Sequence, residues 1–311
     1  MRTQLPFAVL ATVLICSLAS APAHARARTF VASYGNDSNP CTFGSPCKTF
    51  QQAVNVVDPG GEVTAIDSAG FGPILITKAV SITSPNGVEA GIVPVSGGNS
   101  ITINAGPSDT ITLSGLVIDG AGTGANGVLF AAGGALVMQD CVIRNMTGDG
   151  IHFVSNVISS LSVANTFVSK NGGNGILVQP VGSASVTTVF ERVRTQYNGL
   201  NSFGSGISLD VDATAGAVSG TATDTVSSNN SNGFTAEGIL ASLTVVRSVA
   251  ANNHTGVQGT GPSPGAFGIV YFGESTITNN VVACNSQVES FRDNYIIANG
   301  NNSCIFSVSK N

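Results

Sequence analysis

Apolar and polar residues alternate in short runs along this chain, as in Ile101-Thr102-Ile103 and Ile111-Thr112-Leu113. Alternation with a period of two is typical of β-strands, and the 3.6-residue apolar period of helices is missing from these segments. Beyond residue 110, one motif recurs: an aliphatic residue or Thr, two variable positions, and then Asn. Its copies end at Asn145, Asn171, Asn198, Asn229, Asn252 and Asn280, and Asp119 fills the Asn position of an earlier copy. Successive copies are 23 to 31 residues apart, about 27 on average.

A repeat of this length, built from short strands, is typical of a solenoid. We therefore expect an all-β chain that forms a parallel β-helix, with three strands in each coil and about 4.8 Å between coils. The recurring Asn has two uses in such a coil. Asn tolerates the left-handed conformation of a tight corner, and stacked Asn amides form hydrogen bonds from coil to coil. A Gly follows most copies, for example Gly150 and Gly175, where the next strand begins.

A short amphipathic helix is expected near the N-terminus, because Phe50, Ala53, Val54 and Val57 fall on one helical face. Such a helix would close the open end of the solenoid, whose exposed strand edges otherwise invite aggregation. The expected organisation is a signal peptide at 1–25 and an N-terminal cap at 26–62, which holds a disulfide and the helix. The coils occupy 63–283, and a C-terminal coil and cap occupy 284–311.

Residues 1–25 have the pattern of an export signal. Arg2 precedes an apolar run at 5–19, and the small-residue site Ala23-His24-Ala25 follows. No later apolar run is long enough to span a bilayer, so we expect no membrane insertion. The chain has 12 Lys and Arg against 17 Asp and Glu, a net charge of −5, which excludes a typical nucleic-acid binder. The sequence therefore predicts a protein that is secreted or periplasmic.

Five cysteines remain after cleavage behind Ala25. The simplest pairing joins Cys41 to Cys47 and Cys284 to Cys304, and leaves Cys141 as a small buried apolar residue. Zinc binding is the rival interpretation of these pairs. Disulfides are favoured over zinc because the spacings fit no zinc motif and exported proteins usually oxidise such cysteines.

Coils of this length with an Asn corner resemble the right-handed parallel β-helix of the pectate-lyase-like superfamily. The segments at 33–41 and 46–54 are also similar to the N-terminal segment of many exported proteins with such a helix, and the resemblance extends over about residues 30 to 305. It implies a right-handed parallel β-helix of about 27 residues per coil with a short N-terminal capping helix. It also implies an acidic polysaccharide as a partner, since many relatives act on one.

The familiar catalytic motifs of these relatives are absent from the sequence. The Asn-Thr-Asp, Asp-Asp and Gly-His-Gly motifs of polygalacturonases are missing, as are the Arg-x-Pro-x-x-Arg signature of pectate lyases and an Asp-Pro-His-Asp epimerase motif. Whether the protein is an enzyme therefore stays open; if it is one, a lyase acting on a polysaccharide is expected.

One constellation of candidate site residues remains. Arg144, Lys170 and Tyr197 each precede a motif Asn, and the repeat is expected to stack them in a row on successive coils. Arg suits a uronate carboxylate, and Lys or Tyr suits the base of a β-elimination. Asp140 and His152 are expected to contribute to binding. The competing interpretation is that all of these are solvated residues on the outer face.

The sequence predicts no bound metal and no cofactor. Asp210 and Asp212 lie on one face of a strand, as a Ca²⁺ site would need, but solvated charges beside a widened loop are the favoured explanation. Two functions fit a monomeric chain of this kind. One is binding or modification of an extracellular, acidic polysaccharide, and the other is a non-catalytic surface, adhesion or structural scaffold.

Overall fold

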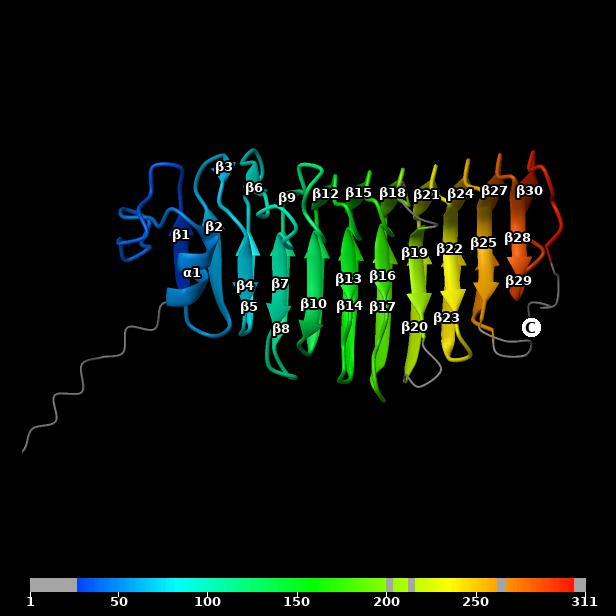
Figure 1. The fold of residues 1–311 in the computed structure, drawn as a ribbon, viewed down its shortest axis with the longest axis horizontal. Coiled ribbons are helices and arrows are strands. Elements are labelled where there is room, and N and C mark those ends of the chain that lie inside the picture. The colour runs from blue at the N-terminus through cyan, green and yellow to red at the C-terminus, as the bar shows by residue number, and fades with distance from the viewer. Residues whose placement is uncertain (1–26, 200–203, 212–215, 262–266, 305–311) are drawn as a thin grey trace, which may run out of the picture.

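The computed structural model describes residues 27–199, 204–211, 216–261 and 267–304, and the expected signal peptide at 1–25 lies outside them. The described chain winds into a parallel β-helix with three sheets, whose strands run side by side along the molecule (Figure 1). Each coil contributes one strand to each sheet, in the order sheet 1, sheet 3, sheet 2. This architecture confirms the expected three-stranded parallel solenoid.

Sheet 1 is an 11-stranded sheet in the described residues. Its strands are β1 (Arg28–Val31), β2 (Gly61–Ala65), β5 (Val80–Thr83), β8 (Thr110–Ser114), β11 (Ala135–Gln139), β14 (Ser159–Ala164), β17 (Ser185–Glu191), β20 (Ala217–Thr223), β23 (Ala241–Val246), β26 (Ile269–Gly273) and β29 (Val288–Ser290).

Sheet 2 comprises β4 (Ile74–Ile76), β7 (Ile101–Asn104), β10 (Val128–Ala132), β13 (Ile151–Phe153), β16 (Ile176–Val178), β19 (Ser205–Asp210), β22 (Asn232–Glu237), β25 (Thr255–Thr260) and β28 (Val282–Ser286). Sheet 3 comprises β3 (Ala69–Gly70), β6 (Ala90–Ile92), β9 (Leu116–Asp119), β12 (Val142–Arg144), β15 (Phe167–Ser169), β18 (Arg194–Gln196), β21 (Val226–Ser228), β24 (Val249–Ala251), β27 (Thr276–Thr278) and β30 (Tyr295–Ile297).

The core is a column of inward-facing side chains, because alternate residues of each strand point to opposite faces. Equivalent positions stack from coil to coil: Ile143 of β12 pairs with Val168 of β15, and both are buried. The rings of Phe130 and Phe153 stack with their centroids 4.1 Å apart. The apolar alternation in the sequence thus becomes a continuous core along the solenoid.

The amphipathic helix lies where the sequence places it, at the N-terminal end of the solenoid (Figure 1). Helix α1 (Phe50–Val56) begins after Thr49, whose side chain accepts a hydrogen bond from the Gln52 backbone N–H. Its apolar face buries Phe50, Ala53 and Val54 against the first coils. The helix therefore covers the edge of the stack, as expected.

Both expected disulfides are present. Cys41 is bonded to Cys47 and Cys284 to Cys304, one near each end of the solenoid, while Cys141 is a buried free thiol. Burial raises the pKa of the Cys141 thiol to about 11, so this cysteine behaves as a small apolar residue.

The sequence suggested two roles for the recurring Asn, a left-handed corner and a stacked amide. At the corner between sheets 3 and 2, two adjacent residues perform these two roles. The first residue of the corner has a left-handed backbone with φ of 56–61° in seven coils, and these residues are Asn145, Lys170, Tyr197, Asn229, Asn252, Asn279 and Ala298. The next residue carries an amide ladder of Asn171, Asn198, Asn230, Asn253, Asn280 and Asn299, of which the first five are buried and the last is half-buried. Neighbouring amides in the ladder are joined by hydrogen bonds of 2.9–3.4 Å.

The recurring Asn of the sequence motif therefore mixes two structural rows. Asn171, Asn198 and Asn280 are ladder residues, whereas Asn145, Asn229 and Asn252 occupy the left-handed corner one position earlier. The glycines that follow are needed because the next coil comes very close. A Cβ at Gly175 would lie 2.6 Å from the carbonyl oxygen of Gly206.

Candidate functional site

A shallow groove crosses the outer face of sheet 3, where β9, β12, β15 and β18 end and the chain turns into sheet 2. Its volume is about 370 Å³. It is lined by Asp119, Arg144, Asn145, Phe167, Ser169, Lys170, Gln196 and Tyr197, which belong to four successive coils. All three candidate catalytic residues of the sequence analysis, Arg144, Lys170 and Tyr197, are among them.

The three residues do not form the single row that the sequence suggested. Arg144 is the last residue of β12, and its neighbours in the stack are Asp119 and Ser169. Lys170 and Tyr197 stand one position later, at the left-handed corner. The correction follows from the mixed Asn motif, because Arg144 precedes a corner Asn and the other two precede ladder Asn residues. The groove still brings all three together, since the two rows are adjacent.

Lys170 and Tyr197 occupy a corner that disfavours them. A left-handed backbone costs roughly 1–2 kcal/mol for most residues, whereas Asn adopts it readily. Four of the seven coils place Asn at this corner, and of the three exceptions, Lys170, Tyr197 and Ala298, the first two are neighbours that both line the groove. Residues held in sparsely populated backbone regions cluster at functional sites. Lys170 and Tyr197 are therefore candidates for residues that are kept at this corner for a ligand.

Asp119 holds Arg144 at one end of the groove. The Arg144 Nε donates a hydrogen bond of 2.8 Å to Asp119 Oδ2, and Asn145 Nδ2 donates one of 3.0 Å to Oδ1. The backbone N–H of Ala121 donates to the same Oδ1. Partial burial alone would raise the pKa of Asp119, but these hydrogen bonds outweigh it and leave that pKa below its ordinary value. Asp119 is thus ionised at neutral pH and orients the guanidinium.

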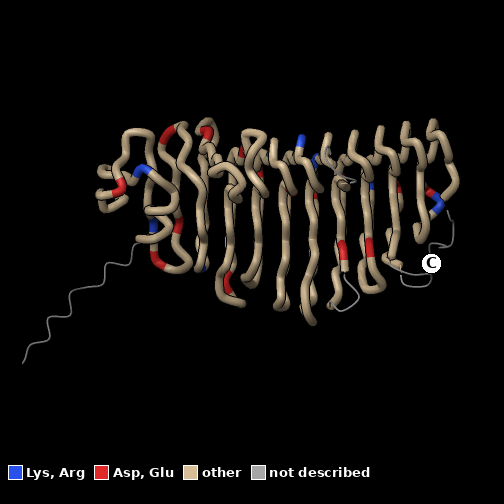
Figure 2. Tube along the Cα trace, viewed as in Figure 1, with Lys and Arg blue, Asp and Glu red and all other residues tan. Residues whose placement is uncertain are grey.

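The middle of the groove is cationic and partly apolar. Lys170 is exposed, and its ammonium makes no hydrogen bond or ion pair with any residue that the structure describes. The guanidinium carbon of Arg194 stands 6.0 Å from the centre of the Phe167 ring, a cation–π contact. The Tyr197 side chain is also exposed. Charged residues are sparse along the solenoid (Figure 2), so three cations around one groove stand out on a chain of net charge −5.

Asp140 and His152 do not line this groove. Asp140 stands at the other corner, between sheets 1 and 3, with φ of 56°. His152 lies on β13 in sheet 2, and its Nδ1 is 3.4 Å from Asp149 Oδ2. Its Nε2 is buried and has no hydrogen-bond partner within the described residues. The two expected binding residues are therefore on different faces of the solenoid.

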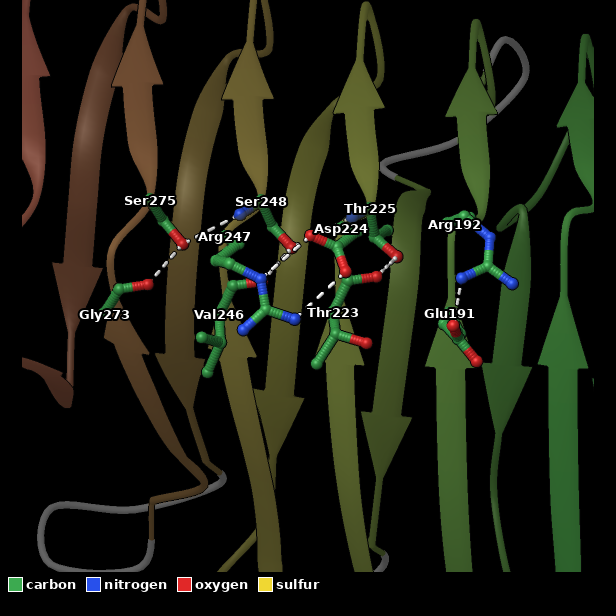
Figure 3. Close-up of polar contacts among 10 residues, drawn as sticks. All are labelled: Glu191, Arg192, Thr223, Asp224, Thr225, Val246, Arg247, Ser248, Gly273 and Ser275. Carbon is green, nitrogen blue, oxygen red and sulfur yellow. Dashed lines mark hydrogen bonds and ion pairs between the residues drawn. The ribbon is translucent and has the colours of Figure 1, made fainter.

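The corner that holds Asp140 carries a row of charged residues of alternating sign, shown in part in Figure 3. Arg247 donates two hydrogen bonds of 3.0 Å to the carboxylate of Asp224 on the preceding coil. These bonds lower the pKa of Asp224. Beside them, the buried hydroxyls of Thr225, Ser248 and Ser275 accept hydrogen bonds from backbone N–H groups of preceding coils. Arg192 Nε likewise donates a hydrogen bond of 2.7 Å to Asn165 Oδ1 of the preceding coil, so side-chain hydrogen bonds link successive coils at this corner.

Sequence reasoning missed Phe167 and Asp119 as lining residues of the groove, and Arg194 as the cation over the Phe167 ring. Phe167 and Arg194 occupy equivalent outer positions of β15 and β18, which pair in register. The alternation of each strand could have revealed the two residues. Phe167 stands two positions before Ser169, and Arg194 two positions before Gln196; Ser169 and Gln196 both line the groove. The correct coil register was needed before these positions became neighbours.

The described residues contain no group of three or more His, Cys, Asp or Glu side chains placed to hold a metal ion. Asp212 of the suggested Ca²⁺ pair lies outside the described residues. Asp210 accepts a hydrogen bond from Gln179 and pairs in register with Glu237 of the next coil. Burial and the nearby Asp210 raise the pKa of Glu237.

Comparisons with known proteins agree with this fold. Residues 64–198 match a family described as a domain of unknown function, DUF4957. No curated protein matches the sequence significantly. Among solved structures, the complex of XylC with xylose superposes with a TM-score of 0.65 at 10% identity, covering 85% of this chain and 68% of that chain.

Two further structures are similar in the same way. The A-module of the Azotobacter vinelandii mannuronan C-5 epimerase AlgE4 gives a TM-score of 0.56 at 16% identity, covering 76% of this chain and 67% of that chain. Pectate lyase Pel9A gives 0.50 at 15% identity, covering 85% and 67%. The chain therefore shares the parallel β-helix fold of these solved structures. Identities this low show the fold alone, so the function must be argued from the groove.

Proposed function

We propose that the groove on sheet 3 binds an acidic polysaccharide outside the cell. The observation that carries the proposal is the pair of Lys170 and Tyr197, which replace Asn at two neighbouring left-handed corners and line the same groove. A left-handed backbone is unfavourable for Lys and Tyr, and a ligand site shared by their two side chains explains why both stand there.

The chemistry of the groove suits such a ligand. Arg144 is oriented by Asp119 and keeps further guanidinium N–H donors for a carboxylate, and Lys170 offers an unpaired ammonium. Phe167 and Tyr197 offer ring faces against which the C–H groups of a sugar can pack. The neighbouring structures lend support, since one contains xylose and two others are a pectate lyase and a mannuronan epimerase.

Export is part of the same proposal. The disulfides Cys41–Cys47 and Cys284–Cys304 suit an oxidising compartment outside the cytoplasm. The apolar run and small-residue site at 1–25 supply the matching signal in the sequence. No helix in the described part of the chain is long and apolar enough to cross a membrane.

A matched set of corner variants tests the binding proposal. Calorimetric titration with oligogalacturonate and oligomannuronate should show binding by the wild type and at least about tenfold weaker binding by Lys170→Asn, since one charge-assisted hydrogen bond is worth about 1.5–3 kcal/mol. Asn279→Lys places the same side chain at an equivalent corner three coils beyond Tyr197, and it should bind as the wild type does. Added salt should weaken the wild-type interaction.

Two results would overturn this function. One is unchanged binding by Lys170→Asn together with Tyr197→Asn. The other is the absence of binding to any acidic glycan, which would favour a non-catalytic scaffold. The same samples assayed for absorbance of an unsaturated uronate product decide whether bound glycan is also cleaved, with Arg144 neutralising the carboxylate and Lys170 or Tyr197 taking the proton.

A further inference from the structure

Seven Asn-Gly pairs occur along this chain, and one of them differs from the rest in its surroundings. Their Asn residues are Asn86, Asn126, Asn171, Asn174, Asn198, Asn232 and Asn299, and all seven pairs lie within the described residues. Asn86 is the one exposed Asn of the set, whereas the others are buried or half-buried. Gly has no Cβ to shield its backbone nitrogen, so the nitrogen that follows the Asn is least hindered in such a pair.

Asn86 and Gly87 are the two central residues of a turn between β5 and β6. The Pro85 carbonyl oxygen accepts a hydrogen bond of 3.0 Å from the Val88 N–H, which closes the turn. Gly87 has φ of 86°, a backbone conformation that favours Gly. Both central residues are exposed, and neither the Asn86 carboxamide nor the Gly87 N–H forms a hydrogen bond with any residue that the structure describes.

The six other pairs are built into the stack of coils. Five of their Gly N–H groups donate hydrogen bonds of 2.6–3.1 Å to carbonyl oxygens of neighbouring coils, and these belong to Gly127, Gly172, Gly175, Gly199 and Gly300. The sixth, Gly233, lies in β22, which is paired with a strand on each side. A backbone nitrogen held in this way reaches its own Asn side chain only after the stack opens locally.

We propose that Asn86 is a site of spontaneous deamidation, with the Gly87 backbone nitrogen as the nucleophile and water as the second reactant. The Gly87 nitrogen loses its proton to solvent base and forms a bond to Asn86 Cγ, and the side-chain nitrogen leaves as ammonia. Water then opens the cyclic imide at either of its two carbonyl carbons, which gives aspartate or isoaspartate. One amide and one water become one carboxylic acid and one ammonia, and no group is oxidised or reduced.

The turn can react while the coils around it stay folded. Ser84 Oγ donates a hydrogen bond of 2.7 Å to the Val88 carbonyl oxygen, and Ser68 Oγ accepts one of 2.9 Å from the Glu89 N–H, so the chain is anchored beside the turn. A Cβ at Gly87 would have no atom within 4 Å, so the space beside its nitrogen is open. The reaction adds a negative charge at the corner between sheets 1 and 3. It goes beyond the proposed binding function and leaves the groove on sheet 3 unchanged.

Peptide mass spectrometry of the folded protein tests the site, after incubation in a mildly alkaline buffer made with heavy-oxygen water. The new carboxyl group takes its oxygen from this water, so reaction during a later digestion in ordinary water carries no label. Cleavage after Glu62 and Glu89 releases a peptide in which Asn86 is the one Asn. This peptide should gain label at least about tenfold faster than the six other Asn-Gly pairs, because those must first open. In urea, all seven pairs should react at similar rates.

Two variants and one internal control separate this chemistry from simple exposure. Asn86→Gln should lose the label, and Gly87→Ala should slow labelling at least about tenfold, because the added methyl shields the nitrogen. Asn156 is also exposed, in the loop between β13 and β14, but Val157 follows it, so it should stay unlabelled. The proposal is overturned if residues 63–89 stay unlabelled in the folded protein while urea allows labelling there, if the other Asn-Gly pairs react equally fast in the folded protein, or if Gly87→Ala reacts at the wild-type rate.

Discussion

Arg144 Nε donates a hydrogen bond of 2.8 Å to Asp119 Oδ2 on the preceding coil, which joins two neighbouring strands of sheet 3 through their outer side chains. The bond fixes the direction of a cation beside the groove. It also ties the charge state of Asp119 to the stability of the coil stack.

Stability should fall in acid, because the pKa values of Asp119 and Asp224 are lower in the folded chain than the ordinary value. Their contribution is present above the unfolded pKa of about 3.9 and is lost as pH falls from there through the lower folded pKa values. Urea unfolding measured between neutral pH and about pH 3 should show this loss. The double variant Asp119→Asn, Asp224→Asn should show a shallower loss, and an unchanged pH dependence would contradict this explanation.

The buried amide ladder should be far more sensitive to substitution than the corner beside it. Asn230 accepts hydrogen bonds of 2.9 and 3.0 Å from the backbone N–H and Nδ2 of Asn198. Asn230→Ala leaves the buried backbone N–H of Asn198 without an acceptor, while Asn198 Nδ2 keeps only its bond to the Val168 carbonyl oxygen, and we expect a loss of about 3 kcal/mol or more in the free energy of unfolding. Asn229→Ala, one residue earlier, should lose only about 1 kcal/mol through its left-handed backbone. Equal losses in chemical denaturation would refute the division of roles.

Lys170→Asn and Tyr197→Asn should stabilise the fold while they weaken binding. Each variant places at a left-handed corner the residue that four equivalent coils use, and we expect a gain of up to about 1 kcal/mol. Thermal melting of the two variants and of the reciprocal Asn229→Lys, which should be destabilised, measures the effect. A destabilised Lys170→Asn would show that Lys170 serves the fold rather than a ligand.

The Cys141 thiol should be inert in the native protein. It is 1% exposed, and burial raises its pKa to about 11, so at pH 8 it is both protonated and inaccessible. In the chain cleaved behind Ala25, which lacks Cys16, a chromogenic thiol reagent should detect no free thiol until denaturant is added, and then one per chain. Rapid labelling of the native protein would contradict the packing around Cys141.

The sequence by itself determined the solenoid, its coil length, the N-terminal helix and the disulfide pairs. These features depend on local patterns: alternation along a strand, a repeat of about 27 residues, and the apolar face that Phe50, Ala53 and Val54 form on a single helix. The sequence also selected Arg144, Lys170 and Tyr197, which the structure brings into one groove.

Only the tertiary structure decided which residues are neighbours across coils. Pairs such as Asn229-Asn230 and Asn252-Asn253 allow two registers, and a shift of one residue exchanges a buried ladder amide for an exposed corner. That choice separates Arg144 from the row of Lys170 and adds Phe167 and Arg194 to the site. The physical reason is that backbone hydrogen bonds and core packing along the whole solenoid determine which residues stack from coil to coil. A single motif in the sequence carries no information about these long-range contacts.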